Sequence, residues 1–483
     1  MNRNHVNHAP LRSRAQDEST FISRWLRGFF LLLVALLIVT TAPPAQAAAT
    51  TFGYGFNMAE WDLDLVESMG FNWIKVFSNP DNRYPVNVLR RVDADASDMV
   101  NLTAFGNEMA QLAQAQAPYI DAYEIGNEPN LDASYGWKAA PNAADYARLL
   151  CEAYDRIKGA DPTAIVVSAG LAPTGRVQGN WNGHPGHNGL FQDERHYLLE
   201  FIAAGGGNCL DVVGYHPYGF SADYNAAPDV ASGDSSQNCA NGFCFRGVEK
   251  IYELMQAHGL GDKKIWATEY GWIVQPPQSC MSDPGWQGRQ WQIVSEAKQA
   301  SNLVGSFEYA TANWPWMEAM FIFNLNFNTA PWYNTCEQMR YYGVQDRPAE
   351  DALRNMPKVE PAGELTITPG ALSVAIADEQ NAYNKTFTFE LRNTGVKSLT
   401  YSITADSDSI VAQVSDGSGT LAPNQTATMQ VTVARGGRGV GVHNSALTVA
   451  TNPAETEAPS SIPVSLFIFD EVHRLHLPVI TRN

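Results

Sequence analysis

The sequence predicts an α/β protein, a (β/α)8 TIM barrel followed by a small C-terminal β-sandwich. Three observations support this fold class. Eight short apolar or β-branched runs alternate with helical stretches between residues 51 and 356. Polar signatures follow several of these runs, as the catalytic face of a barrel requires. Every tryptophan and every cysteine precedes residue 337, and from about residue 360 the chain is rich in Thr, Ser, Val and Ala.

Each of the eight runs is predicted to form one strand of the barrel. A helix is predicted between the fourth and fifth runs, because Tyr146, Leu150 and Ile157 recur at helical spacing. A doubly wound open sheet is the alternative, but the first run is not followed by the Gly-x-Gly-x-x-Gly sequence that such a sheet favours. The predicted strands are residues 51–56, 71–77, 86–92, 122–125, 164–169, 210–215, 264–268 and 319–323.

Residues 1–47 are predicted to be a secretory signal peptide. Basic residues precede the apolar run 29–39, and Ala45-Gln46-Ala47 is a typical cleavage pattern. A permanent membrane anchor is the alternative, but the run has only about half of the roughly 20 residues that a spanning helix needs. We therefore expect a secreted protein without a membrane span after cleavage, and attachment to the cell surface stays open.

The rest of the chain is predicted to divide into a barrel domain at 50–358, a sandwich at 359–472 and a tail at 473–483. Pro357 and Gly363 follow the last helical segment and suit a short linker.

The sandwich is predicted from short β-prone runs that are separated by turn residues, such as 365–368, 386–391, 428–433 and 463–469. This pattern resembles the immunoglobulin-like modules that are appended to many secreted bacterial enzymes. Because this part of the chain has no tryptophan, a spacer or attachment role suits it better than sugar binding.

The six cysteines are an even number in a chain that is expected to be exported, which favours disulfides over a metal site. Cys239 and Cys244 lie within one loop rich in Gly and Asn and form the clearest pair. The connectivity of the other four stays open, with Cys280–Cys336 favoured if their loops are neighbours and Cys151–Cys209 then left by elimination.

The formal net charge of -18 at pH 7 gives the protein little reason to bind nucleic acid or an anionic membrane. We expect a neutral partner, and the sequence predicts no oligomeric state.

Two glutamates, Glu128 and Glu269, follow the fourth and seventh predicted strands. In a closed barrel these strands have their carboxyl ends at the same end of the barrel, where the active site is built. A carboxylic acid and a carboxylate that face one sugar linkage are the minimum equipment for cleaving it. Facing strands can hold them about 5–5.5 Å apart, as in enzymes that retain the anomeric configuration, whereas inverting enzymes need roughly 6.5–9.5 Å.

Three motifs follow the fourth, sixth and seventh predicted strands. They are Gly126-Asn127-Glu128-Pro129, His216-Pro217-Tyr218 and Thr268-Glu269-Tyr270-Gly271. Together they resemble clan A of the glycoside hydrolases, with family 39 and family 5 types as the nearest branches. The Asn-Glu-Pro triplet alone is only moderately specific, but the combination of the three motifs is much more specific. The resemblance covers most of residues 51–350.

The resemblance implies a double displacement in which Glu128 is the acid/base and Glu269 the nucleophile. Glu128 must start protonated, and partial burial and the negative charge of Glu269 would both favour that form. Asn127 would hydrogen-bond the sugar 2-hydroxyl. In the His216-x-Tyr218 pair, the tyrosine hydroxyl would donate to the nucleophile.

Lys75 stands where many relatives carry Arg after the second strand. We expect it to supply positive charge near Glu269, although a lysine cannot form the two-pronged bond that an arginine gives a carboxylate.

Tryptophans in the loops after strands are candidates for platforms that stack on sugar rings. Trp272, three residues after Glu269, is the best placed of them. The set is Trp137, Trp181, Trp272, Trp286 and Trp332.

These observations predict a secreted retaining glycoside hydrolase that acts on a neutral β-linked poly- or oligosaccharide. Endo action is favoured over release of single sugars, and we expect neither a metal ion nor a cofactor. A non-catalytic glycan-binding barrel and a transglycosylase on the same scaffold are the alternatives.

Overall fold

The computed structural model describes residues 52–358, 365–393, 398–406, 410–422, 425–452 and 460–470. The predicted signal peptide, most of the predicted linker and the predicted tail lie outside these ranges. None of the helices in the described part of the chain has the length and apolarity that a membrane span requires.

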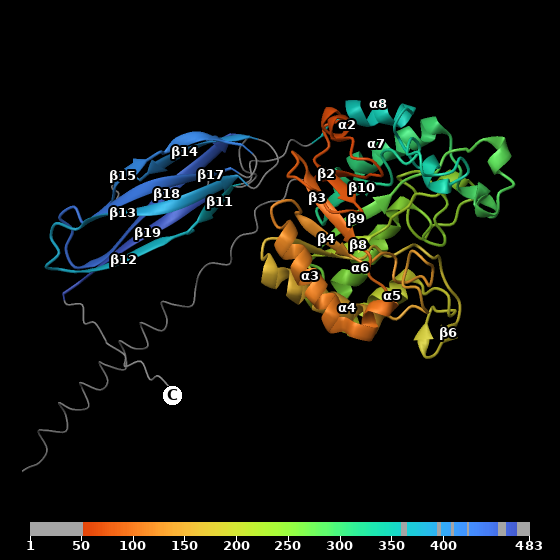
Figure 1. The fold of residues 1–483 in the computed structure, drawn as a ribbon, viewed down its shortest axis with the longest axis horizontal. Coiled ribbons are helices and arrows are strands. Elements are labelled where there is room, and N and C mark those ends of the chain that lie inside the picture. The colour runs from red at the N-terminus through yellow and green to blue at the C-terminus, as the bar shows by residue number, and fades with distance from the viewer. Residues whose placement is uncertain are drawn as a thin grey trace, which may run out of the picture. The chain divides into compact units, whose positions relative to one another are not determined.

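Eight parallel strands close into a barrel in the order β1-β10-β9-β8-β5-β4-β3-β2, which confirms the predicted barrel (Figure 1). Each strand overlaps one of the predicted runs, with ends that differ by no more than two residues. The strands are β1 Gly53–Asn57, β2 Trp73–Val76, β3 Asn87–Val92, β4 Ala122–Ile125, β5 Ile165–Ser168, β8 Val212–Tyr215, β9 Lys264–Tyr270 and β10 Met317–Ile322.

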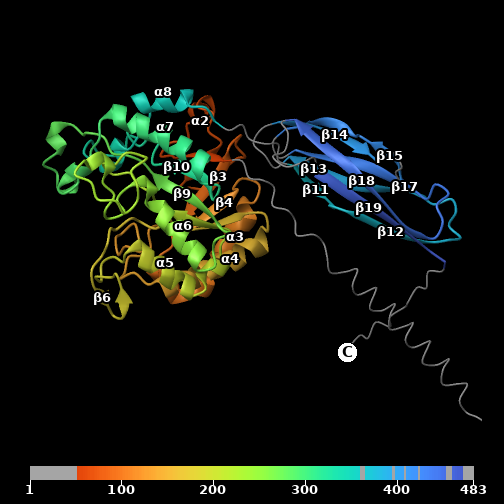
Figure 2. The ribbon, with the colours of Figure 1, turned by 180° about the vertical axis from the view of Figure 1, so that it is seen from behind.

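Helices cover the outside of the barrel (Figures 1 and 2). The predicted helix is α4, whose Tyr146, Leu150 and Ile157 are buried and whose first turn is capped by the side chain of Asn142. The helices are α2 Leu63–Ser68, α3 Leu102–Gln116, α4 Ala143–Ala160, α5 Glu194–Ala203, α6 Val248–Ala257, α7 Glu296–Asn313 and α8 Pro348–Asn355.

The connection between β2 and β3 departs from the repeating strand–helix pattern, because residues 77–86 of the structure contain no helix. Pro80 and Pro85 lie within these ten residues. Since proline disfavours helical backbone at the residue before it and clashes in a helix interior, so short a segment has no room for one.

The barrel interior is apolar at one end and charged at the other. Side chains alternate between the two faces of a strand, so Trp73 and Lys75 of β2 both point inward, as do Ala122 and Glu124 of β4. Strand β1 contributes glycine to this interior. A Cβ atom on Gly55 would lie 2.4 Å from the ring of Phe321, so only glycine fits there.

The C-terminal strands form two sheets whose facing side chains make a separate apolar core, which confirms the predicted sandwich. One sheet has the order β11-β13-β17-β15 and the other β12-β19-β18-β14-β16. Their strands are β11 Leu365–Thr368, β12 Leu372–Ala377, β13 Asn384–Asn393, β14 Leu399–Ala405, β15 Val411–Ser415, β16 Ser418–Leu421, β17 Thr426–Ala434, β18 Gly441–Asn452 and β19 Ser460–Phe469.

Three disulfides connect the six cysteines, and all three pairings match the favoured set. They are Cys151–Cys209, Cys239–Cys244 and Cys280–Cys336.

Candidate active site

Glu128 and Glu269 lie at the same end of the barrel. Glu269 is the second-last residue of β9, and Glu128 follows β4 by three residues. Because the strands are parallel, both side chains start from the carboxyl ends of their strands, where the functional sites of such barrels are built.

The turn after β4 holds Glu128 in an unusual backbone conformation. Its φ of 41° lies in the left-handed region, which costs a residue other than glycine about 1–2 kcal/mol. Backbone hydrogen bonds hold the turn, since the Glu128 N–H donates to the Gly170 carbonyl at 3.1 Å and its carbonyl accepts from Leu131 at 2.9 Å. Backbone strain of this kind concentrates at functional sites.

His216 links the two carboxylates. Its Nδ1 atom lies 2.9 Å from Oε1 of Glu128 and 3.9 Å from Oε2 of Glu269. These two oxygens are therefore no more than about 7 Å apart, a limit that includes the roughly 5–5.5 Å of retaining enzymes and only the lowest part of the inverting range.

Tyr218, two residues after His216, contacts Glu269 from a second direction. Its hydroxyl donates to Oε2 at 2.9 Å. Burial, and next the negative charge of Glu269, raises the pKa of Tyr218 well above its usual value. The hydroxyl therefore keeps its proton and stays a donor.

Lys75 reaches the same carboxylate from the barrel interior. Its Nζ atom lies 3.0 Å from Oε1 of Glu269 and 2.6 Å from Oε2 of Glu124, and the side chains of Lys75 and Glu124 are both completely buried. Nζ also donates to the Thr268 carbonyl at 3.3 Å. The expected positive charge thus lies beside Glu269, although it is shared with a second carboxylate.

Glu124 is a member of this cluster that the sequence reasoning missed. One of its oxygens accepts from the Gly170 N–H at 3.1 Å and lies 3.9 Å from Nε2 of His216. A signal was present, because Glu124 is a charged residue inside a four-residue strand whose other members are apolar. A side chain in that setting, two positions from Ala122 on the inner face, needs a buried cation as partner.

The charges in the cluster shift one another's pKa values. Burial by itself disfavours a charged His216, but Glu269, Glu124 and Glu128 outweigh it and raise the pKa of His216 to about 9. Burial likewise opposes the charges of Glu124 and Glu269, but Lys75 and then His216 lower the pKa of both carboxyl groups overall. These directions favour a charged His216 and ionised Glu124 and Glu269.

Asn127 has a free acceptor beside this cluster. Its Nδ2 atom donates to the carbonyl of Tyr135 at 2.9 Å, whereas its Oδ1 atom is buried without a hydrogen-bond partner among the described residues. A buried unpaired acceptor is costly, and a ligand hydroxyl can satisfy it.

The expectation for Trp272 is wrong. This side chain is completely buried, and its Nε1–H donates to the carbonyl of Ala222 at 2.7 Å. It packs against Tyr270 and Phe245. Sequence position placed it near Glu269, but loop packing turns its ring into the core, so no face is left for a sugar.

The other four candidate tryptophans differ in their exposure. Trp137 and Trp286 are buried, whereas Trp181 and Trp332 are exposed. Trp291 is also exposed, and the sequence reasoning missed it.

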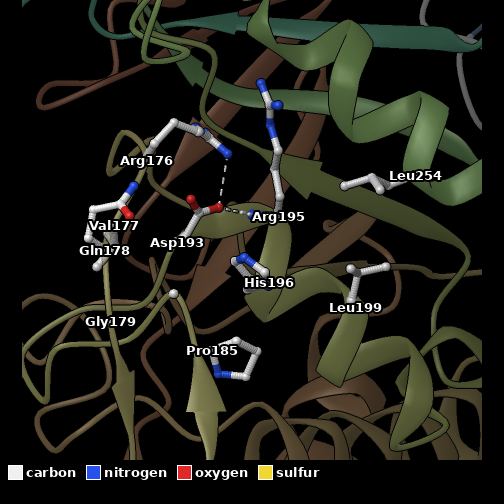
Figure 3. Close-up of a pocket in the computed structure, with 11 residues that line it drawn as sticks. Arg176, Val177, Gln178, Gly179, Pro185, Asp193, Arg195, His196, Leu199 and Leu254 are labelled. Carbon is white, nitrogen blue, oxygen red and sulfur yellow. Dashed lines mark hydrogen bonds and ion pairs between the residues drawn. The ribbon is translucent and has the colours of Figure 1, made fainter.

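A separate cavity of about 600 Å³ lies at the start of α5 (Figure 3). Its ionisable side chains are largely paired with neighbours, since Arg176 contacts Asp193 and Arg195 contacts Asp229. None of the predicted site residues lines it.

No protein-family model matches the chain, and no curated protein matches it. Among solved structures, a β-glucuronidase from Bacteroides uniformis is 14% identical with a TM-score of 0.38, over 84% of this chain and 43% of that chain. A glucosidase from Croceicoccus marinus is 10% identical with a TM-score of 0.43, over 80% and 96% of the two chains. A PapD-like domain of human CEP192 is 13% identical with a TM-score of 0.20, over 24% and 93%. The chain thus spans less than half of the β-glucuronidase, and the assignment of an activity depends on the site itself.

Proposed function

We propose that this protein is a retaining glycoside hydrolase that cleaves a neutral β-linked glycan. One observation carries the proposal: His216 connects Glu128 to Glu269 at distances that keep the two carboxylates within about 7 Å of each other. The retaining separation of roughly 5–5.5 Å fits within that limit, whereas most of the inverting range of roughly 6.5–9.5 Å lies beyond it.

In the first step, Glu269 attacks the anomeric carbon while Glu128 gives its proton to the leaving oxygen. The bond to the leaving group breaks, and an ester forms between the sugar and Glu269. In the second step, Glu128 takes a proton from water, the water oxygen attacks the anomeric carbon, and Glu269 leaves as a carboxylate. Two inversions at one carbon give net retention.

The surrounding groups fit this division of roles. Lys75 and Tyr218 stabilise Glu269 as the anion that attacks and that leaves again. His216 can donate to Oε1 of Glu128 and so stabilises the carboxylate that forms when the proton moves to the leaving group. The free oxygen of Asn127 can accept from the sugar 2-hydroxyl.

A non-catalytic glycan-binding barrel is less well supported. Burying several charges in one cluster is costly, and binding a neutral sugar does not require it. A transglycosylase would use the same first step, with an acceptor sugar in place of water.

We further propose that the protein is exported, with residues 1–47 as its signal peptide and 50–358 as its catalytic domain. Three disulfides support export, because such bonds persist in oxidising compartments.

The proposal is tested with a panel of aryl β-glycosides and neutral polysaccharides, followed by NMR of the first product. We expect the β-anomer to form first and Glu269→Gln to lower kcat at least about 10³-fold. Glu253→Gln, an exposed glutamate paired with Lys250, is the control and should keep full activity. Early formation of the α-anomer, or full activity in Glu269→Gln, would contradict the proposal.

Azide separates the two roles. In Glu269→Ala it should restore turnover and give the α-glycosyl azide, because it replaces the missing nucleophile. In Glu128→Ala it should attack the glycosyl-enzyme and give the β-azide. The same azide anomer from both variants would show that the roles are assigned wrongly.

A further inference from the structure

Three aromatic side chains, Phe220, Phe243 and Trp291, form a cluster that we call the aromatic platform. The rings of Phe220 and Trp291 are stacked, with centroids 5.5 Å apart and planes only 8° from parallel. Phe243 packs edge-on against Phe220 at 4.8 Å and tilted against Trp291 at 5.7 Å. Despite these contacts Trp291 remains 49% exposed. One partner thus supports the indole while much of its surface stays open to solvent.

The platform is assembled from two connections of the barrel. Phe220 and Phe243 both come from the connection between β8 and α6, and Trp291 comes from a short 3-10 helix after β9. Both connections start at carboxyl ends of barrel strands. The Cys239–Cys244 disulfide limits the motion of the segment that carries Phe243.

The buried side chain of Trp272 holds the loop that carries Phe220 in place. Phe220 has a φ of 52°, a conformation that a bulky residue adopts only when its surroundings impose it. Gly219 lies directly on the buried ring of Trp272, where a Cβ atom would come within 1.9 Å of the indole. Trp272 also binds the Ala222 carbonyl on the other side of Phe220. Trp272 thus has a role for this loop, as its support rather than as a sugar contact.

The platform is connected to the proposed catalytic pair through the same loop. Phe220 follows Tyr218 by two residues, a span of at most about 7 Å of backbone, and the Tyr218 hydroxyl donates to Glu269. The platform therefore adjoins, along the chain, the residue that contacts Glu269, and it lies on connections that leave the same end of the barrel.

The chemistry of the platform fits a sugar ring. An exposed indole presents a flat apolar face and one N–H donor at its edge. A pyranose has the complementary form, with C–H groups on its faces and hydroxyls at its rim. The net charge of -18 of the protein disfavours binding of a polyanionic glycan.

We propose that Trp291, supported by Phe220, binds a sugar ring of a neutral glycan chain outside the ring that is attacked. This inference rests on the proposed function, and it makes the protein an enzyme that recognises a chain rather than a single sugar.

Binding and turnover are measured separately to test it. Calorimetry of the full-length Glu269→Gln protein with cellohexaose, xylohexaose and mannohexaose identifies the hexasaccharide that binds. The added substitution Trp291→Ala should weaken that binding about tenfold or more, and Trp291→Phe should weaken it less. The control is Tyr119→Ala, because Tyr119 precedes β4 and so lies at the opposite end of the barrel.

In the active protein, Trp291→Ala should lower kcat/KM on the hexasaccharide by the same factor and leave it unchanged on an aryl monoglycoside. Since Trp291 is half-exposed at the surface, the thermal unfolding midpoint of Trp291→Ala should stay close to that of the parent protein. Three outcomes would refute the proposed role of Trp291. They are unchanged hexasaccharide binding in Trp291→Ala, an equal loss of kcat/KM on both substrates, and no binding of any of the three hexasaccharides.

The outcomes also separate this inference from the proposed function. Weaker binding in Trp291→Ala without hydrolysis by the parent protein supports the platform and refutes the hydrolase. Hydrolysis of the hexasaccharide at the same rate by Trp291→Ala and by the parent protein supports the hydrolase and refutes the platform.

Discussion

Lys75 and Glu124 form an ion pair of 2.6 Å inside the barrel, and neither side chain is exposed to solvent. The pair connects β2 to β4, and the same ammonium group extends to Glu269 on β9. A residue that the sequence reasoning passed over thus shares the cation next to the proposed nucleophile.

Removing the charge of Glu124 should destabilise the fold. In Glu124→Gln the buried Lys75 loses one of its two carboxylates, and breaking a buried pair costs about 3–5 kcal/mol. Urea denaturation measures the change in the free energy of unfolding. Glu152→Gln breaks a partly exposed pair with Arg156 and should cost less than about 1 kcal/mol. Equal, small losses of unfolding free energy in both variants would show that the buried pair contributes no more to stability than the partly exposed pair.

Lys75→Met should move the acid limb of the pH–activity profile to higher pH. Lys75 is the strongest of the groups that lower the pKa of Glu269, so without it that carboxyl group takes up a proton at a higher pH and stops attacking. Profiles of kcat/KM against pH on an aryl β-glycoside show the shift. Lys250→Met, at an exposed pair, should leave the limb in place. An acid limb at the same pH in Lys75→Met would mean that the pKa of Glu269 does not depend on Lys75.

His216 should make the stability of the protein fall as the pH rises. The pKa of His216 is about 9 in the folded protein and about 6.5 in an unfolded chain, so the folded state binds the extra proton between these values. Its contribution, on the order of 3 kcal/mol, is complete below pH 6.5 and is lost as the pH rises through 9. Urea titrations at several pH values, with His216→Asn for comparison, measure it. Parallel curves for the two proteins between pH 6.5 and 9 would refute the prediction.

Tyr218→Phe should lower kcat about 10–100-fold, because a hydrogen bond to a charged group contributes about 1.5–3 kcal/mol. KM should change little, since the partner of the hydroxyl is the attacking carboxylate of Glu269. Tyr342→Phe is the matched control, because its ring packs 5.4 Å from that of Tyr218. A similar loss in both variants would point to packing instead of the hydrogen bond.

Much of the fold could be predicted from local patterns. A barrel strand that is buried on both faces is a short apolar run, and all eight runs became strands. The two glutamates could be located for the same reason, because a strand end fixes where the next residues lie. The segment between β2 and β3 shows the limit of this reasoning. The regular repeat of the fold suggested a helix that its two prolines exclude.

Burial of single side chains was harder to predict. Trp272 and Trp291 both follow β9 in one loop, yet one is completely buried and the other half-exposed. Nothing in their sequence neighbourhoods separates them, since their exposure depends on which distant loops pack over them.

By itself the sequence determined the eight strands, the sandwich and the motifs that carry Glu128 and Glu269, because these depend on residues that are neighbours along the chain. Only the tertiary structure decided which charges meet. His216 lies 88 positions from Glu128, and Lys75 lies 194 positions from Glu269. Barrel closure brings such residues within hydrogen-bond distance, and the pKa values and contacts of the site follow from that approach.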